Sequence, residues 1–216
     1  MSSNPYKQSL EWESAYFQTR RDLKKRQERI SLFNISQNDF VLDLGCGDGL
    51  NISLLKRVGI KKIVGVEPSK QFFNLAKKNN PRVEVYQATA EKLPFKNNTF
   101  DVVLVDSVFH HITDYQASLS EISRVLKDGG VLCFLEPRNT FLRWLADTVA
   151  PTWIGQNLPV IKTRSKAYMG EREVMTHWLS TYDQFFNLLK KAGFKKIFCE
   201  NNGESFAGKY KNEKNR

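Results

Sequence analysis

One stretch of this 216-residue chain restricts the fold more than any other: VLDLGCGDG, from Val41 to Gly49. A short apolar strand pattern leads directly into three glycines at alternate positions, Gly45, Gly47 and Gly49. Glycine adopts positive φ angles without strain and lets a ligand approach the main chain closely. Because a helical pattern follows at residues 50–57, the run predicts the strand, ligand-binding turn and helix of a nucleotide-binding α/β fold.

Two acidic side chains in this run restrict the charge of the ligand. A pyrophosphate binds where free amides and the helix dipole favour an anion, at the helix N-terminus. Asp48 lies at that place, and Asp43 comes shortly before the first glycine. Carboxylates repel a pyrophosphate but suit a nucleoside that carries a cationic group, and S-adenosylmethionine is such a ligand. The alternative is an ordinary tight turn in which Asp48 caps the helix.

A third acid follows the second predicted strand. The apolar run from Ile63 to Val66 ends in Glu67, which comes 22 residues after Gly45. An acid at this spacing, at the end of the second strand, is placed to accept hydrogen bonds from ribose hydroxyls. We therefore expect Glu67 to bind a ribose.

Five sequence blocks occur in a characteristic order: VLDLGCGDG, VGVEPS, ATAEKLPF, FDVVLVDSVFHHI and EISRVLKDGGVLCFLEP. With these blocks, residues 39–139 resemble the class I S-adenosylmethionine-dependent methyltransferases, most of all the branch called methyltransferase type 11. A weaker resemblance covers residues 181–210. The resemblance implies transfer of a methyl group from S-adenosylmethionine to an oxygen, carbon or nitrogen atom of an acceptor.

The resemblance also implies a set of cofactor-binding residues around the blocks. They are Asp43, Gly45, Cys46, Gly47, Glu67, Pro68, Thr89, Ala90, Glu91 and Asp106. The glycine loop and the neighbourhood of Asp106 would meet the methionine part, Glu67 the ribose, and the others the adenine. The family usually has an acid at the position of Thr89. A hydroxyl can still accept a hydrogen bond from the adenine amino group, but without the help of a charge.

Catalysis of methyl transfer requires an acceptor atom aligned with the methyl group and a site without water. A hydroxyl or acidic carbon acceptor also benefits from a general base. His110 and His111 follow the fourth predicted strand, where the resemblance places them between cofactor and acceptor, and Glu136 ends the fifth strand at the same crevice. Either histidine is a candidate base, and packed or capping histidines are the alternative. Three scattered cysteines and three histidines show no zinc-binding spacing, so we expect no metal.

Strand and helix patterns alternate along the chain. The predicted strands are 39–44, 61–66, 83–87, 100–105 and 130–136, and the predicted helices are 50–57, 69–79 and 114–127, with a turn at 127–130. We expect a single α/β domain with a doubly wound, mostly parallel, seven-stranded Rossmann-like sheet. A helix at 182–192 and a hairpin of residues 195–200 and 205–210 would supply the antiparallel last strand.

The single domain would have four parts. Residues 1–38, with an amphipathic helix at 6–33, form an N-terminal helical cap with a basic outer face. Residues 39–138 form the cofactor-binding core, and residues 182–216 the C-terminal helix and hairpin. Residues 139–181 are the least explained part, where Phe141, Leu142, Leu145, Ala146 and Val149 share a helical face and Trp144 and Trp153 add aromatic area. This part is an acceptor-side lid, a helix packed on the fold, or a contact with a membrane surface.

The distribution of charge suggests which partners the protein binds, and the composition suggests its cellular compartment. The net charge of +10 lies mainly outside the core, with +3 in residues 1–38 and +6 in residues 162–216. Basic flanks suit RNA, anionic lipid or an acidic substrate, or are solvated lysines. No apolar run approaches 18 residues, the N-terminus has no signal-peptide pattern, and the cysteines are isolated, so we expect a cytoplasmic protein.

A small-molecule, lipophilic acceptor is therefore the favoured substrate class. The alternative is an RNA or protein methyltransferase that docks its substrate on the basic flanks. The run from Asp106 to Phe109 counts against the amino-group methylases of nucleic acids, which usually carry a proline-rich motif there. The oligomeric state is not predicted.

Overall fold

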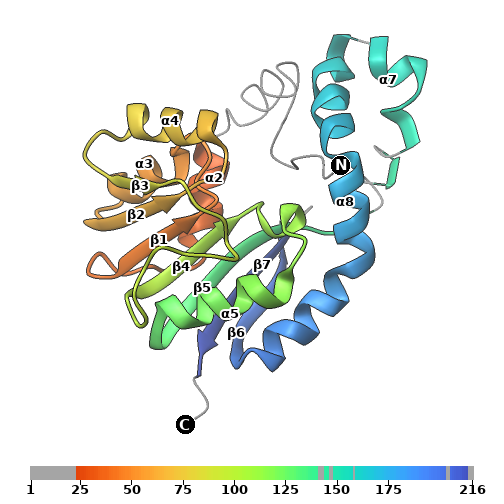
Figure 1. Ribbon diagram of the computed structural model, residues 1–216. Coiled ribbons are helices and arrows are strands. Elements are labelled where there is room, and N and C mark those ends of the chain that lie inside the picture. Colours follow the sequence, from red (N-terminus) through yellow and green to blue (C-terminus); the bar gives the residue numbers. More distant parts are fainter. Residues whose placement is uncertain (1–22, 141–143, 146–147, 158, 203–204, 214–216) are drawn as a thin grey trace.

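The computed structural model describes residues 23–140, 144–145, 148–157, 159–202 and 205–213 (Figure 1). Within these residues, one seven-stranded sheet has the order β3-β2-β1-β4-β5-β7-β6. The strands are β1 Phe40–Leu44, β2 Lys62–Val66, β3 Glu84–Tyr86, β4 Phe100–Asp106, β5 Leu126–Pro137, β6 Phe194–Asn202 and β7 Ser205–Asn212. All pairs from β3 to β5 are parallel, and β7 runs antiparallel to both β5 and β6. The predicted fold, a doubly wound sheet with an antiparallel last strand, is confirmed.

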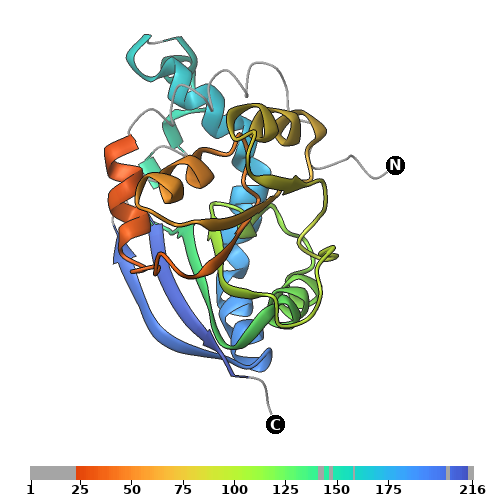
Figure 2. The same ribbon diagram turned by 90° about the vertical axis from the view of Figure 1, so that its left-hand side faces the viewer.

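Helices cover both faces of this sheet. The helices whose bounds the described residues give are α2 Leu23–Ser31, α3 Leu50–Arg57, α4 Lys70–Asn79, the 3-10 helix η1 Phe109–His111, α5 Tyr115–Val125, α7 Trp153–Asn157 and α8 Pro159–Lys191. Figure 1 shows α5 and α8 over one face, and Figure 2 shows α2 and α3 over the other. In the described part of the chain, no helix is long and apolar enough to cross a membrane.

The central strands are buried on both faces and therefore read as continuous apolar runs. In β4, Val102 and Leu104 belong to the core formed with α2, α3 and α4, while Val103 and Val105 belong to the core formed with α5 and α8. Alternate side chains of a strand thus point into two different hydrophobic cores, one on each side of the sheet. These cores hold the carboxyl ends of the strands in place.

Two predicted elements differ from the observed ones, and a third lies mostly outside the described residues. The turn expected at 127–130 is wrong, because β5 begins at Leu126 and runs through these residues. The pairing of β5 with β4 shifts its register between Phe100 and Val102, and Gly129 adopts a φ of 76°, so the glycines permit an irregularity within a strand. The helix expected at 182–192 is the end of the much longer α8. Most of the helix expected at 6–33, and Phe141, Leu142 and Ala146, lie outside the described residues.

Close packing of β7 against β5 gives a test of the sheet order. A Cβ atom at Gly208 would lie 2.4 Å from Cζ of Phe134, a fully buried ring that also contacts Phe185 and Tyr210. We expect Gly208→Ala to lower the free energy of unfolding by about 1–3 kcal/mol, because overpacking forces the ring to move. Urea unfolding measures this change. The double variant Gly208→Ala/Phe134→Leu should recover part of the loss, whereas wild-type stability of Gly208→Ala would contradict the packing.

Candidate active site

The predicted site residues come from strands that are neighbours in the sheet. The glycine loop follows β1, Glu67 follows β2, Asp106 ends β4, and Glu136 lies near the end of β5. Because β2, β1, β4 and β5 are adjacent and parallel, these residues gather at one edge of the sheet. The order reverses between β1 and β4, and ligands of open α/β sheets bind at such a switch point.

The glycine loop turns sharply back toward β2. Gly45, Gly47 and Gly49 have φ angles of 71°, 56° and 81°, in the left-handed region that favours glycine. The amides of Gly45 and Cys46 donate to the carbonyl of Val66 at 2.8 and 2.9 Å. A side chain at Gly45 would collide with Val108, 2.4 Å away, so the loop also packs against the turn after β4.

Glu67 organises the same loop from the neighbouring strand. Its buried carboxylate accepts a hydrogen bond from the amide of Gly47 and another from the amide of Ser69, both at 2.9 Å. Ser69 is the N-cap of α4. A carboxylate has about four acceptor positions, so one that binds two amides can still accept hydrogen bonds from a diol.

Asp43 and Cys46 lie in the interior of the site. Both are buried, and burial raises the pKa of the Cys46 thiol well above its usual value, with further contributions from the carboxylates of Asp43 and Glu67. A thiol with a raised pKa is a poor nucleophile. Asp48 is half-buried, and its Oδ1 accepts a hydrogen bond from the amide of Leu50 at 3.3 Å.

Asp106 takes part in a charged network that the sequence patterns did not indicate. Arg26 of α2 donates to Oδ2 of Asp106 at 2.6 Å and to Oδ1 of Asn51 at 2.7 Å. Arg29 lies 3.7 Å from Oδ1 of Asp106. The Arg26 side chain is only 12% exposed, so the expectation of a purely outward basic face on this helix is wrong at Arg26. The sequence gives only a weak indication that Arg26 faces inward. Arg26 precedes the buried Ile30 by four residues, and residues four apart share a face of a helix.

The residues expected near the adenine follow β3 and lie beside the end of β2. The amide of Glu67 donates to the carbonyl of Tyr86 at 3.0 Å, and Nε2 of Gln87 donates to the carbonyl of Pro68 at 3.3 Å. Pro68 is half-buried. The loop that follows holds Thr89, Ala90 and Glu91, of which Ala90 is buried in the core and the other two are half-buried.

A buried histidine and glutamate pair lies between β4 and β5. Nδ1 of His110 is 2.8 Å from Oε2 of Glu136, and both side chains are buried. Oε1 of the same carboxylate accepts hydrogen bonds from the amides of Val108 and Phe109 at 2.7 and 2.6 Å. The ring of His111 lies against that of His110, with centroids 4.1 Å apart. Glu136 thus fixes both the turn after β4 and the orientation of His110.

Burial changes the proton affinities in this cluster in opposite directions. Desolvation raises the pKa of Glu136 to about 8, against the lowering effect of the two amides. Desolvation lowers the pKa of His111 to about 3, and His110 adds to that effect. His111 is therefore neutral at physiological pH, while Glu136 holds its proton more tightly than an ordinary carboxyl group. Among the described residues, no three His, Cys, Asp or Glu side chains cluster so as to hold a metal ion.

Known proteins resemble this chain over most of its length. The methyltransferase domain family matches residues 42–134. A ubiquinone/menaquinone biosynthesis C-methyltransferase of Campylobacter jejuni is 27% identical over 184 residues, which cover 81% of this chain and 78% of that protein. A demethylmenaquinone methyltransferase of Lactiplantibacillus plantarum is 28% identical over 187 residues, with coverage of 80% and 77%.

Solved structures of methyltransferases share this fold. The crystal structure of an S-adenosylmethionine-dependent methyltransferase from Aquifex aeolicus superposes with a TM-score of 0.60 and 21% identity, and the match covers 88% of each chain. The sheet order, the glycine loop at its switch point and the matched family agree. The chain carries a methyltransferase domain over residues 42–134 and has the fold of the S-adenosylmethionine-dependent methyltransferases.

Proposed function

We propose that this methyltransferase transfers the methyl group to a ring carbon of a lipophilic acceptor of the hydroquinone type. The observation that carries the proposal is the buried pair of His110 and Glu136, with 2.8 Å between Nδ1 and Oε2. Methylation of a phenolic ring carbon requires a proton acceptor at the site, and this pair is able to serve as one. The names of the two curated relatives, which refer to menaquinone and ubiquinone biosynthesis, support the same acceptor class.

The chemistry of the site suits the proposed cofactor. Asp106 offers a carboxylate for an ammonium group, and Arg26 beside it offers a guanidinium for a carboxylate, the two charges of a methionine moiety. The positive φ angles of the glycine loop leave its backbone open to close approach. In the proposal, Glu67 accepts hydrogen bonds from the ribose, and Pro68 and residues 89–91 face the adenine. When bound, S-adenosylmethionine supplies a methyl group that its sulfonium has already activated.

The proposal assigns the proton to His110. Nδ1 of its ring is engaged by Glu136, so proton exchange with an acceptor hydroxyl runs through Nε2. As the ring carbon bonds to the methyl group, the sulfur–methyl bond breaks with its electron pair left on sulfur, and one proton leaves the acceptor. Glu136 stabilises the imidazolium that forms or takes up the second imidazole proton. His111, whose pKa desolvation lowers to about 3, remains neutral and contacts the acceptor without taking its proton.

An assay with a water-soluble acceptor tests this function. The purified chain, labelled S-adenosylmethionine and a demethylmenaquinol analogue without its isoprenoid tail should yield a ring-methylated product. Mass spectrometry locates the new methyl group, and a carbon position is expected because the relative from Campylobacter jejuni is named as a C-methyltransferase. A matched naphthol whose ortho carbons already carry methyl groups is the control and should not react. Transfer to oxygen only, or no transfer to any hydroquinone, would overturn the proposal.

The same assay separates the acceptor classes. Total RNA and denatured protein extract serve as the alternative acceptors at equal mass. Label in RNA that falls steeply as salt is added would favour a nucleic-acid substrate docked on the basic flanks. We expect label in the hydroquinone fraction alone.

A further inference from the structure

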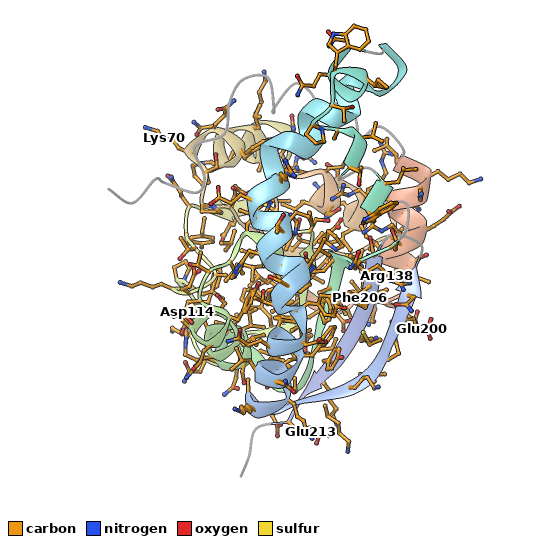
Figure 3. The ribbon with its side chains drawn as sticks, turned by 90° about the vertical axis from the view of Figure 1, so that its right-hand side faces the viewer. Lys70, Asp114, Arg138, Glu200, Phe206 and Glu213 are labelled. Atoms are coloured by element: carbon orange, nitrogen blue, oxygen red, sulfur yellow. The ribbon has the colours of Figure 1, made fainter. Side chains whose placement is uncertain are left out.

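A helical projection extends beyond the sheet edge that carries the site. It consists of α7 and the part of α8 that precedes Trp178. Nε1 of Trp178 donates to the carbonyl of Pro137 at 2.7 Å, which fixes α8 at the point where β5 ends. The 19 residues of α8 before that point rise about 28 Å as a helix. Figure 3 shows α7 at the far end of α8, beyond the remainder of the molecule.

Hydrogen bonds and close packing define the backbone at the end of this projection. The hydroxyl of Thr152 donates to the carbonyl of Val149 at 2.6 Å and accepts from the amide of Gly155 at 3.3 Å. Ala150 is buried, and a Cβ atom at Gly155 would lie 2.3 Å from the carbonyl oxygen of Val149. The backbone around α7 is therefore closely packed.

Large apolar side chains on this packed segment face solvent. Trp153 is 75% exposed and Ile154 is 52% exposed, at the beginning of α7. Trp144 and Leu145, shortly before them in the chain, are 56% and 42% exposed. Four of the nine exposed large apolar residues in the described part of the chain thus fall within residues 144–157. Trp153 and Ile154 are adjacent and both exposed, and neighbouring exposed apolar side chains mark a contact surface, whereas single ones do not.

The charge on either side of this stretch indicates the kind of surface it meets. In the sequence, residues 144–157 carry one acid, Asp147, and they are flanked by the bases Arg138, Arg143, Lys162, Arg164 and Lys166. Tryptophan and aliphatic side chains next to basic ones are typical of segments that lie in the interface of an anionic membrane. An RNA partner explains the bases and the tryptophans but gives Ile154 and Leu145 no base to stack on.

We propose that α7 docks this enzyme on anionic lipid bilayers, with Trp153 and Ile154 inserted between the headgroups. The projection leaves the same sheet edge that carries the glycine loop and the pair of His110 and Glu136. Docking through its tip turns that edge toward the bilayer, where a lipophilic acceptor is dissolved. In this respect the inference rests on the proposed function, since only a lipophilic acceptor requires such delivery.

Co-sedimentation of the full chain with vesicles tests the docking. We expect binding to phosphatidylcholine vesicles that contain phosphatidylglycerol, weak binding to phosphatidylcholine alone, and release at high salt. Trp153→Ser/Ile154→Ser should lower the partition coefficient about tenfold or more, because burial of these side chains drives insertion. The control Val58→Ser/Ile197→Ser removes apolar side chains of 41% and 53% exposure elsewhere and should bind as the wild type does. Absence of vesicle binding, equal binding of both variants, or displacement of the vesicles by RNA would overturn the proposal.

A second measurement separates this inference from the function on which it rests. Both double variants should methylate the tail-free hydroquinone at the wild-type rate, because the four replaced side chains face solvent and none is a proposed site residue. On vesicles loaded with the tailed acceptor, only Trp153→Ser/Ile154→Ser should be slow. Turnover of the soluble acceptor without vesicle binding contradicts the docking alone. Vesicle binding without turnover of any hydroquinone contradicts the proposed acceptor alone.

Discussion

Glu67→Ala is expected to weaken the binding of S-adenosylmethionine about 100-fold, because two kinds of hydrogen bond are lost at once. The carboxylate accepts from the amides of Gly47 and Ser69, so its removal releases both the glycine loop and the beginning of α4. It also removes the proposed acceptor of the ribose hydroxyls. Isothermal titration calorimetry with S-adenosylmethionine measures the change.

The matched control is Glu84→Ala on the neighbouring strand β3. Glu84 is an exposed acid whose carboxylate accepts a hydrogen bond from the hydroxyl of Tyr86, so its loss should leave the affinity within about twofold. Thermal unfolding of both variants separates a local loss of binding from a general loss of structure. Wild-type affinity of a folded Glu67→Ala variant would remove Glu67 from the cofactor site.

His110→Ala is expected to lower kcat for the hydroquinone acceptor by about 10²–10⁴-fold, the range that general base catalysis contributes. The affinity for S-adenosylmethionine should change far less, because the pair lies between β4 and β5 and the expected ribose and adenine contacts lie at β2 and β3. Stopped-assay rates at saturating cofactor give kcat. His177→Ala is the matched control, since His177 is an exposed histidine of α8.

The pH profile distinguishes a base from a merely structural pair. Burial raises the pKa of Glu136 to about 8, so the pair holds a proton below that pH and cannot accept one from the substrate. Activity of the wild type should therefore rise with pH and level off above about 8. Glu136→Gln keeps an acceptor for the amides of Val108 and Phe109 but leaves His110 without the carboxylate, so the rise should move to lower pH and the plateau should fall. An unshifted profile of reduced height would show that Glu136 has only a structural role.

Much of the fold and of the site could be predicted from local patterns. The glycine run predicts its own turn because positive φ angles favour glycine, and the spacing of Glu67 from the first glycine predicts its place at the end of the second strand. The buried strands read as apolar runs because the sheet is covered on both faces. The resemblance to the methyltransferases placed His110 and Glu136 at one crevice, and the structure places them 2.8 Å apart.

Contacts made across long stretches of chain could not be predicted in this way. Arg26 contacts Asp106 across 80 residues, and only its place one helical turn before Ile30 distinguishes it from the other bases of the helix. Residues 127–130 have the composition of a turn, yet β5 runs through them as an irregularity between Leu126 and Val131, which both pair with β4. The length of α8 was missed because its first part projects from the fold and therefore lacks the apolar periodicity of a helix packed along its whole length.

The position of β7 in the sheet has a consequence for the synthesis of the chain. This strand is made after β6 but lies between β6 and β5. As the polypeptide leaves the ribosome, β5 therefore has an open edge and β6 has no partner until residues 205–212 emerge. Open strand edges pair with other chains when they persist. We therefore expect the yield of native protein to depend on how soon β7 pairs with β5 and β6. Slower growth or chaperone capacity during expression should have its largest effect before β7 has paired.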